Sequence, residues 1–253
     1  MPIQDTHYLN LAVDAATKAS HFLLKNFGKN QDIITEEERE IHFRCDLEAE
    51  KIIINELRNG SAYKIVTEES GLIYAADGGY DYSWIVDPLD GSINYSEGIP
   101  FSCVSISLWK NSFPVLGVIY DFSRDQIYEG VIGQGAWVNK QPIRVKPFRR
   151  PEKAILCTGF PAAMDFSEIS MKTFFERVKK YRKIRMFGSA ALSLAFVASG
   201  KVDAYYEKNI KIWDVAAGLA LVKAAGGEIS CKGFPESYVV EAFGGTALDF
   251  LTR

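Results

Sequence analysis

The sequence predicts an α/β (α+β) protein in which helices are layered against sheets. Three observations carry this prediction: helical periodicity in the first 60 residues, short β-rich segments up to residue 138, and alternating strand and helix patterns after that point. The chain has 253 residues, of which 47% are hydrophobic and 24% charged. A chain of this size and composition buries a large core without a disulfide framework.

The N-terminal region predicts two helices. Apolar residues recur at helical spacing over residues 6–27, and Gly28 ends the pattern as a C-cap. A second helix is expected to start near Asp46, an acceptable N-cap residue, and to end at Gly60. Residues 29–44 are polar and read as a mobile surface segment that carries the acid run Glu36, Glu37, Glu38 and Glu40.

Short β-rich segments follow, separated by Gly, Asn, Asp and Ser. This pattern is typical of a sheet with antiparallel hairpins, with strands at 63–67, 83–86, 104–109, 115–120, 126–132 and 136–138. Two prolines and clustered charge then interrupt the pattern over residues 145–154. We therefore predict an N-terminal α+β half at 1–146 and a C-terminal α/β half at 147–253.

The second half alternates between strand and helix patterns. Strands are expected at 154–158, near Ile184 and at 203–207, and helices at 167–181, 189–199 and 214–225. Such alternation indicates a layered α/β unit. No element is assigned after Gly227.

Composition and charge limit the class of protein. A formal net charge of -3 argues against a dedicated nucleic-acid partner, since such domains are basic. The N-terminus does not resemble a signal peptide, and no apolar run reaches the length of a membrane span. Widely spaced cysteines favour free thiols in a reducing compartment over zinc or disulfides: Cys45, Cys103, Cys157 and Cys231. We expect a cytoplasmic protein with no membrane partner.

The most informative segment runs from Trp84 to Ser92. An apolar strand leads into two carboxylates, Asp87 and Asp90, with Pro88 fixing one φ angle between them. At a strand end this arrangement directs both acids and one backbone carbonyl toward the same point. Hard oxygen ligands of this kind suit Mg²⁺ better than zinc. The simpler interpretation is an Asx turn that only ends the strand.

Two further acid positions follow the same logic. Glu68 and Glu69 come directly after an apolar strand, and Asp214 follows Trp213 at the start of an alanine-rich helix. Alone, the glutamates read as a solvated loop and Asp214 as a residue that complements the helix dipole. Together with Asp87, these acids predict a group of carboxylates from separate strand and helix ends.

These motifs resemble the inositol monophosphatase family. The paired signature is Asp87-Pro-Leu-Asp90-Gly-Ser with Trp213-Asp214-Val-Ala-Ala-Gly218, and Thr67-Glu68-Glu69-Ser70 and the GSAAL…GKVDAYYE stretch also match. The similarity covers the first helix to about residue 230. It implies a layered αβαβα sandwich of the inositol monophosphatase and fructose-1,6-bisphosphatase type, with a metal site at the junction of the two halves, and a homodimer.

The resemblance also implies a ligand set for two or three Mg²⁺ ions. Glu68, Asp87 and the Leu89 carbonyl would hold the first ion. Asp87, Asp90 and Asp214 would hold the second. Two such ions stabilise the attacking and leaving oxygens of an in-line displacement.

The remaining roles concern catalysis and the substrate. Glu68 and the Ser92 hydroxyl would orient the attacking water, and Asp46 would help a weaker third ion. Backbone N–H groups of Gly91 and Ser92 would bind phosphate oxygens. The residues that would contact the substrate are Asp90, Gly91, Ser92, Ala190, Glu207 and Asp214. The chain departs from the family at Ser92, where threonine is usual, although the hydroxyl is kept.

The sequence therefore predicts a Mg²⁺-dependent phosphomonoesterase for a small polyol or sugar phosphate, either inositol-1-phosphate or fructose-1,6-bisphosphate. The short chain and Gly98-Ile-Pro-Phe101 resemble the prokaryotic members. One alternative is a 3′(2′),5′-bisphosphate nucleotidase or NADP phosphatase; a remote one is a catalytically silent regulatory protein that binds metal. The basic stretch at 172–185 reads as a solvated helix face, with a docking site for a second phosphate as the alternative.

Overall fold

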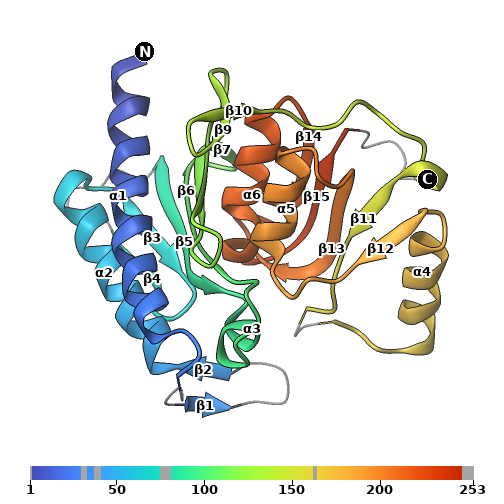
Figure 1. The fold of residues 1–253 in the computed structure, drawn as a ribbon, viewed down its shortest axis with the longest axis horizontal. Coiled ribbons are helices and arrows are strands. Elements are labelled where there is room, and N and C mark those ends of the chain that lie inside the picture. Colours follow the sequence, from blue (N-terminus) through green and yellow to red (C-terminus); the bar gives the residue numbers. More distant parts are fainter. Residues whose placement is uncertain (1, 30–32, 37–40, 75–80, 162–163, 247–253) are drawn as a thin grey trace.

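Five layers build the molecule, in the order helix, sheet, helix, sheet, helix (Figure 1). The computed structural model describes residues 2–29, 33–36, 41–74, 81–161 and 164–246. Its helices are α1 (Pro2–Asn26), α2 (Arg44–Gly60), α3 (Ser92–Ser96), α4 (Glu168–Val178), α5 (Ala190–Ala198) and α6 (Ile212–Ala224). The predicted αβαβα layering is confirmed.

The first sheet has eight strands in the order β10-β9-β8-β7-β6-β5-β3-β4. Their bounds are β3 (Lys64–Thr67), β4 (Gly71–Ile73), β5 (Tyr82–Asp90), β6 (Cys103–Lys110), β7 (Phe113–Asp121), β8 (Gln126–Val131), β9 (Gly135–Val138) and β10 (Gln141–Ile143). Its pairs are antiparallel, as predicted, except that β3 and β5 are parallel.

The second sheet has five strands in the order β12-β11-β13-β15-β14. Their bounds are β11 (Ile155–Cys157), β12 (Lys183–Arg185), β13 (Ala204–Lys211), β14 (Glu228–Lys232) and β15 (Val239–Gly245). Strand β11 runs parallel to both of its neighbours, and the remaining pairs are antiparallel. A short 3-10 helix, η1 (Pro151–Lys153), precedes this sheet.

Side chains along each strand of the first sheet alternate between its two faces, and helices cover both faces. In β6, Val104, Ile106 and Leu108 pack with the buried residues of α1 and α2. The residues between them are small and polar, and the Ser107 hydroxyl faces the other side, 3.4 Å from the Ala216 carbonyl of α6. Period-two alternation therefore directs each face toward a different helical layer.

The middle layer consists of α5 and α6, which are apolar on every side because sheets cover them on both faces. Small residues allow close packing there. A side chain at Gly117 of β7 would lie 2.4 Å from the Ala217 carbonyl, and one at Gly218 would meet Leu194 at 2.4 Å. This packing fixes the N-terminal ends of α5 and α6 beside the end of β5.

Several predicted boundaries are wrong. The second helix begins at Arg44, so Asp46 is its third residue rather than its N-cap, and its carboxylate accepts the Phe43 N–H at 3.0 Å. The segment read as mobile contains a two-stranded sheet, β1 (Ile33–Glu36) and β2 (Ile41–Phe43), while Glu37, Glu38 and Glu40 lie outside the described residues. Strands β4, β10, β14 and β15 were not predicted.

One apolar core joins the two sheets through α5 and α6. The strands of the first sheet precede residue 144 and those of the second follow residue 154, but the division at 146/147 stays a prediction. The prediction of free thiols is confirmed for all four cysteines. No helix in the described ranges is long and apolar enough to cross a membrane.

Candidate active site

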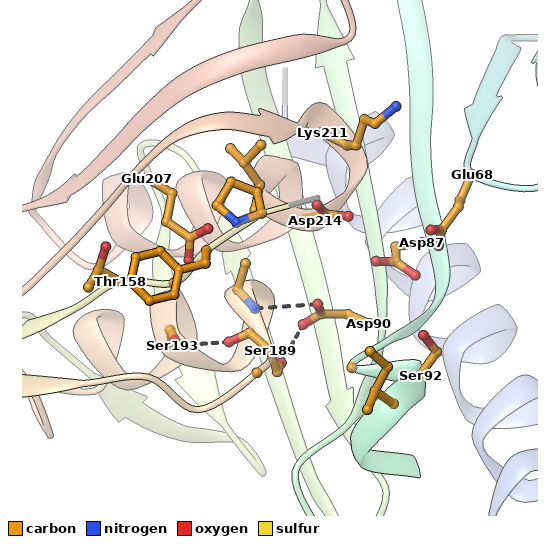
Figure 2. A pocket seen from close by; sticks show the side chains of 18 of the residues that line it. Glu68, Asp87, Asp90, Ser92, Thr158, Ser189, Ser193, Glu207, Lys211 and Asp214 are labelled. Carbon is orange, nitrogen blue, oxygen red and sulfur yellow. Dashed lines mark hydrogen bonds between the residues drawn. The ribbon is translucent and has the colours of Figure 1, made fainter. Parts of the chain in front are cut away.

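A cavity opens where β5 ends and where α3, α5 and α6 begin (Figure 2). Residues far apart in sequence meet in its wall, and both halves of the chain contribute. Of the predicted site residues, the cavity brings together Glu68, Asp87, Leu89, Asp90, Gly91, Ser92, Ala190, Glu207 and Asp214. It does not include Asp46.

A bulge in β5 places two acids on the same side of the strand. Asp87 pairs with Ser105 of β6, and Asp90 pairs with Cys103, so three steps along β5 match two along β6. In a regular strand, residues three apart point to opposite faces, and the extra residue removes that opposition. The Leu89 N–H donates to Asp87 Oδ1 at 2.9 Å. The Asx turn of the simpler interpretation is thus present, within a larger arrangement.

Gly91 links the bulge to α3. Its φ of 84° lies in the left-handed region, and a side chain there would lie 2.8 Å from the Phe101 carbonyl. Glycine alone fits both conditions. The Gly91 carbonyl then accepts the Tyr95 N–H at 3.0 Å, which closes the first turn of the helix that begins with Ser92.

Asp90 lies at the N-terminus of α5. Its carboxylate accepts the Ser189 hydroxyl, the Ala191 N–H at 2.9 Å and the Ala190 N–H at 3.3 Å. Ser189 also caps the helix by accepting the Leu192 N–H at 3.2 Å. Burial raises the pKa of Asp90 to about 6, and these donors limit the rise because they stabilise the charged form.

The other acids of the cavity have fewer hydrogen-bond donors to stabilise their charged forms. Burial raises the pKa of Asp87 well above its usual value, and the charges of Glu68, Asp90 and Asp214 raise it further. Asp214 is affected in the same way, first by burial and then by Glu68 and Asp90. Burial also raises the pKa of Glu207 to about 8. Among the residues that line the cavity, Lys211 is the one with a cationic side chain.

This donor set fits a hard divalent cation. Buried carboxylates raise one another's pKa because their negative charges repel. A bound cation lowers the free energy of the ionised carboxylates, and a ligand set made only of oxygen atoms suits Mg²⁺. Within the described part of the chain, no three Asp, Glu, His or Cys side chains are already gathered as a finished ligand group. The acids surround the cavity instead, so side-chain rotation would have to bring them onto the ion.

Two acids of α2 accept hydrogen bonds from neighbouring segments and do not line the cavity. Asp46 is buried and accepts the Phe43 N–H, and the Cys45 thiol lies 3.4 Å from it. Glu50 lies one turn further along the same helix. It is buried, and it accepts the Thr67 hydroxyl at 2.7 Å and the Ser70 N–H at 3.0 Å. Glu50 therefore holds the turn that carries Glu68.

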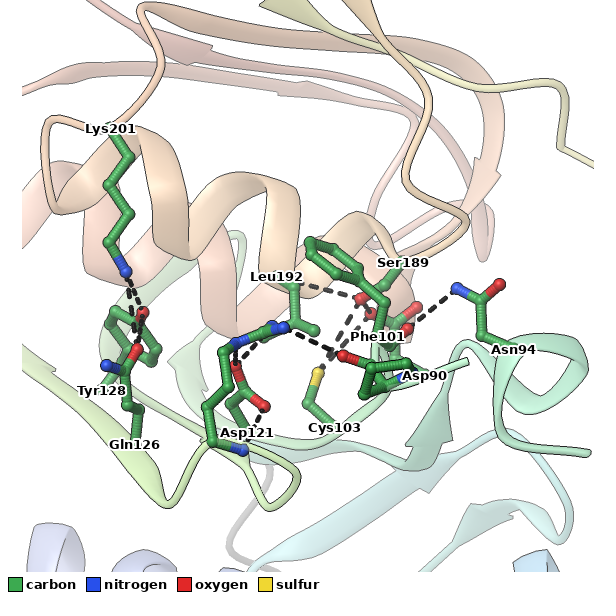
Figure 3. Close-up of polar contacts among 12 residues, drawn as sticks. Asp90, Asn94, Phe101, Cys103, Asp121, Gln126, Tyr128, Ser189, Leu192 and Lys201 are labelled. Carbon is green, nitrogen blue, oxygen red and sulfur yellow. Dashed lines mark hydrogen bonds and ion pairs between the residues drawn. The ribbon is translucent and has the colours of Figure 1, made fainter. Parts of the chain in front are cut away.

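Asn94 connects the two halves at the edge of the cavity. Its side-chain N–H₂ donates to the Phe101 carbonyl at 2.9 Å and to the Phe187 carbonyl at 2.8 Å. Figure 3 shows the first of these contacts. Because Phe187 precedes the turn at Gly188 and Ser189, Asn94 holds the start of α5 against the loop after α3.

Sequence reasoning missed several lining residues: Thr158, Gly159, Ser189, Ser193, Asn209 and Lys211. For two of them a signal was available. Ser189 belongs to the GSAAL stretch, where a serine before an apolar helix is an N-cap signal, and Lys211 directly precedes Ile212-Trp213-Asp214.

The fold and the cavity define a class: five-layered α/β proteins with an acid-lined cavity between the two sheets. The chain belongs to the inositol monophosphatase family, because the model of that family matches residues 4–247. The expected family is thereby confirmed.

Three relatives illustrate the similarity. "Nus factor SuhB" of Xylella fastidiosa is 38% identical over 225 residues, which covers 87% of this chain and 80% of that protein. "Inositol monophosphatase 1" of Solanum lycopersicum is 34% identical over 230 residues and covers 87% and 82%. Among solved structures, the extragenic suppressor protein suhB of Bartonella henselae matches with a TM-score of 0.86 and 33% identity, covering 97% of this chain and 96% of that one.

Proposed function

We propose that this chain is a Mg²⁺-dependent phosphomonoesterase acting on a small polyol or sugar phosphate, such as inositol-1-phosphate or fructose-1,6-bisphosphate. The observation that carries the proposal is the meeting of Glu68, Asp87, Asp90 and Asp214 around one cavity. Membership of the inositol monophosphatase family supports the same conclusion.

Two cation positions are consistent with the lining residues. Glu68, Asp87 and the Leu89 carbonyl would hold one Mg²⁺, and Asp87, Asp90 and Asp214 would hold the other. When bound, the ions would neutralise charge on the phosphoryl group and acidify a water molecule. A third ion lacks a ligand from Asp46 in this cavity, because Asp46 does not line it.

The chain's own groups would bind and orient the ester. The N–H groups of Gly91 and Ser92, at the start of α3, would donate to phosphate oxygens. Glu68 would accept a proton from the attacking water, and the Ser92 hydroxyl would orient that water. Lys211 would offset part of the charge of the dianionic phosphate.

The opposite wall would receive the alcohol. Ala190 leaves room for a polyol ring, and Glu207 faces it. Because burial raises the pKa of Glu207 to about 8, its carboxyl keeps a proton at neutral pH. A protonated carboxyl donates to one substrate hydroxyl and accepts from another, which suits a polyol.

A second candidate is a regulatory protein built on the same fold. Its support is that relatives with 38% and 35% identity carry the name Nus factor SuhB. The homodimer, the cytoplasmic location and the absence of a nucleic-acid partner stay predictions.

Phosphate release from the purified protein tests the first candidate against the second. The substrates are inositol-1-phosphate, fructose-1,6-bisphosphate, 3′-phosphoadenosine 5′-phosphate and NADP, each with Mg²⁺ and with EDTA. Mg²⁺-dependent release from one of the first two supports the proposal. Release from the nucleotides alone favours the nucleotidase alternative, and release from none, with Mg²⁺ bound, favours the regulatory protein.

A further inference from the structure

A second cavity lies beside the first, between α4 and the strands β13 and β15. The two share Thr158, Gly159, Pro161, Glu207 and Asn209 in their walls. The second has a volume of about 330 Å³ and the first about 230 Å³. A substrate seated in the first cavity could therefore extend into the second.

Gly159 and Glu207 form the boundary between the cavities. A side chain on Gly159 would come within 2.7 Å of Glu207 Oε1. Any other residue at 159 would displace the Glu207 carboxyl or narrow the passage. Because glycine has no side chain, the two cavities stay connected beside residue 159.

A stacked pair forms one wall of the second cavity. The Arg177 guanidinium lies 3.8 Å from the centre of the Tyr206 ring. Tyr206 is buried, and its hydroxyl donates to Glu241 at 3.1 Å, which fixes the ring. Ile169 and Phe174 of α4 add apolar surface. Planar and apolar groups of this kind pack against a ring.

The charges of this cavity do not favour a second phosphate. Its cations are Arg177 and Lys208, and they are offset by two acids, Asp165 and Glu241, while the protonated Glu207 adds no positive charge. Hydrogen bonds from Ser167 lower the pKa of Asp165, and the nearby charge of Lys208 lowers it further. Of the basic stretch at 172–185, Arg177 alone lines the cavity.

We propose that the second cavity binds an uncharged ring carried by the alcohol of the substrate, so that the preferred phosphomonoester has a ring beyond the phosphorylated unit. This inference rests on the proposed function. A heteroaromatic base and a second sugar ring both have this chemistry, and matched substrates separate them.

The experiment compares kcat/KM within pairs of esters in which one member carries an added ring, ring system or phosphate. Trehalose-6-phosphate against glucose-6-phosphate adds an uncharged sugar ring, and adenosine 2′-phosphate against β-glycerophosphate adds a nucleoside ring system. Fructose-1,6-bisphosphate against fructose-6-phosphate adds a phosphate. We expect the kcat/KM of one ring-bearing ester to exceed that of its partner by about tenfold, the scale of one stacking contact.

Variants then assign that preference to the cavity. Arg177→Met keeps a long side chain over Tyr206 but removes the guanidinium, and Ser170→Trp fills the cavity from α4. In both variants, the ratio of kcat/KM between the two members of the ring pair should fall close to one. Turnover of glucose-6-phosphate should stay within about twofold of wild type. Lys172→Met, on an exposed position of the same helix, is the matched control and should keep the wild-type ratio.

Three results would overturn the inference: equal rates within both ring pairs, a ring preference that survives both variants, or a bisphosphate preference that Arg177→Met removes. Each of these leaves hydrolysis of the one-ring esters intact. Loss of all activity, with every ester and in the wild-type protein, would instead contradict the proposed function.

Discussion

Two strands of the first sheet, β5 and β7, lie on either side of β6, and each carries a buried aspartate near its C-terminal end: Asp87 in β5 and Asp121 in β7. Their side chains are almost equally buried, with 1% and 0% of their surface exposed. Asp121 accepts the Arg124 Nε at 2.6 Å and its backbone N–H at 3.2 Å, while Asp87 accepts the Leu89 N–H. The polar contacts around Asp121 are drawn in Figure 3.

The difference separates a buried acid that has a cationic partner within the chain from one that, in our proposal, binds a metal ion. Burial raises the pKa of both, but at Asp121 the Arg124 guanidinium opposes the rise, and at Asp87 the neighbouring acids add to it. Arg124 also donates to the Pro100 carbonyl at 2.9 Å, which ties the hairpin of β7 and β8 to the loop after α3. The chain supplies its own cation for Asp121, whereas the proposed function has Asp87 bind one from solution.

Removing the charge of Asp87 should give the largest effect. Asp87→Asn keeps the shape of the side chain, so phosphate release should fall at least about a thousandfold as the electrostatic contribution is lost. The Tm in EDTA should stay constant or rise, because one of several mutually repelling acids is gone. Asp81→Asn, at an exposed position before the same strand, is the control. A wild-type rate in Asp87→Asn would remove this residue from the site.

Removing the partner of Asp121 should lower the free energy of unfolding. Arg124→Met leaves a buried carboxylate without its partner, a change that costs about 3 kcal/mol and lowers Tm by roughly 6–12 °C. Urea unfolding measures it. Lys51→Met, which breaks an exposed pair with Glu48, should cost under about 1 kcal/mol. Equal losses in the two variants would mean that the Asp121 pair is no stronger than a surface pair.

The acid-lined cavity should make stability depend on pH and Mg²⁺. The folded pKa of Asp90 is raised to about 6 and that of Glu207 to about 8, so the folded chain binds more protons than the unfolded chain over this range. Stability in EDTA is therefore fully present below about pH 4 from these groups and is lost as pH rises toward 8.

Mg²⁺ should reverse that loss where the acids are ionised. At about pH 8, an ion concentration a hundredfold above Kd contributes about 2.7 kcal/mol, and at about pH 5 much less. Thermal melts over this pH range, with EDTA and with Mg²⁺, measure both effects. A Mg²⁺ effect of the same size at both pH values would contradict the assignment of the cation site to Glu68, Asp87, Asp90 and Asp214.

Ser189→Ala should give the smallest effect. It removes the cap of α5, worth about 1 kcal/mol, and one donor to Asp90. Because the hydroxyl orients a proposed ligand, kcat/KM at low Mg²⁺ should fall about tenfold and recover as Mg²⁺ is raised. Ser167→Ala removes the equivalent cap of α4 and should lower stability alone. An identical response of the two variants would mean that Ser189 acts only as a cap.

The long helices and the inner strands of the first sheet were predictable because their apolar residues follow a single period. The strand β15 was not, although it lies between two other strands, since Gly244 and Gly245 and the polar residues before it hide the β pattern. The short strands β4 and β10 have three residues each, too few for a period to appear.

At the site, the identity of the acids and their convergence were predictable, but the backbone geometry that brings them together was not. The spacing of Asp87 and Asp90 suggests a turn, and only the register with β6 reveals the bulge. The contact of Asp90 with Ser189 joins residues 99 positions apart, which no local pattern encodes. Asp46 was assigned by resemblance to a catalytic role, and its burial beside Phe43 places it outside the cavity.

The acids come from different layers of the molecule: Asp87 from the first sheet, Glu68 from the turn after β3, and Asp214 from α6, the helix between the sheets. An ion shared by Asp87 and Asp214 would act as a removable cross-link between segments more than a hundred residues apart. Unfolding either half would then release the ion, so the two halves would lose structure together. The concentration of free Mg²⁺ would set how firmly they are joined, and a chelator would loosen the molecule at its centre rather than at its edges.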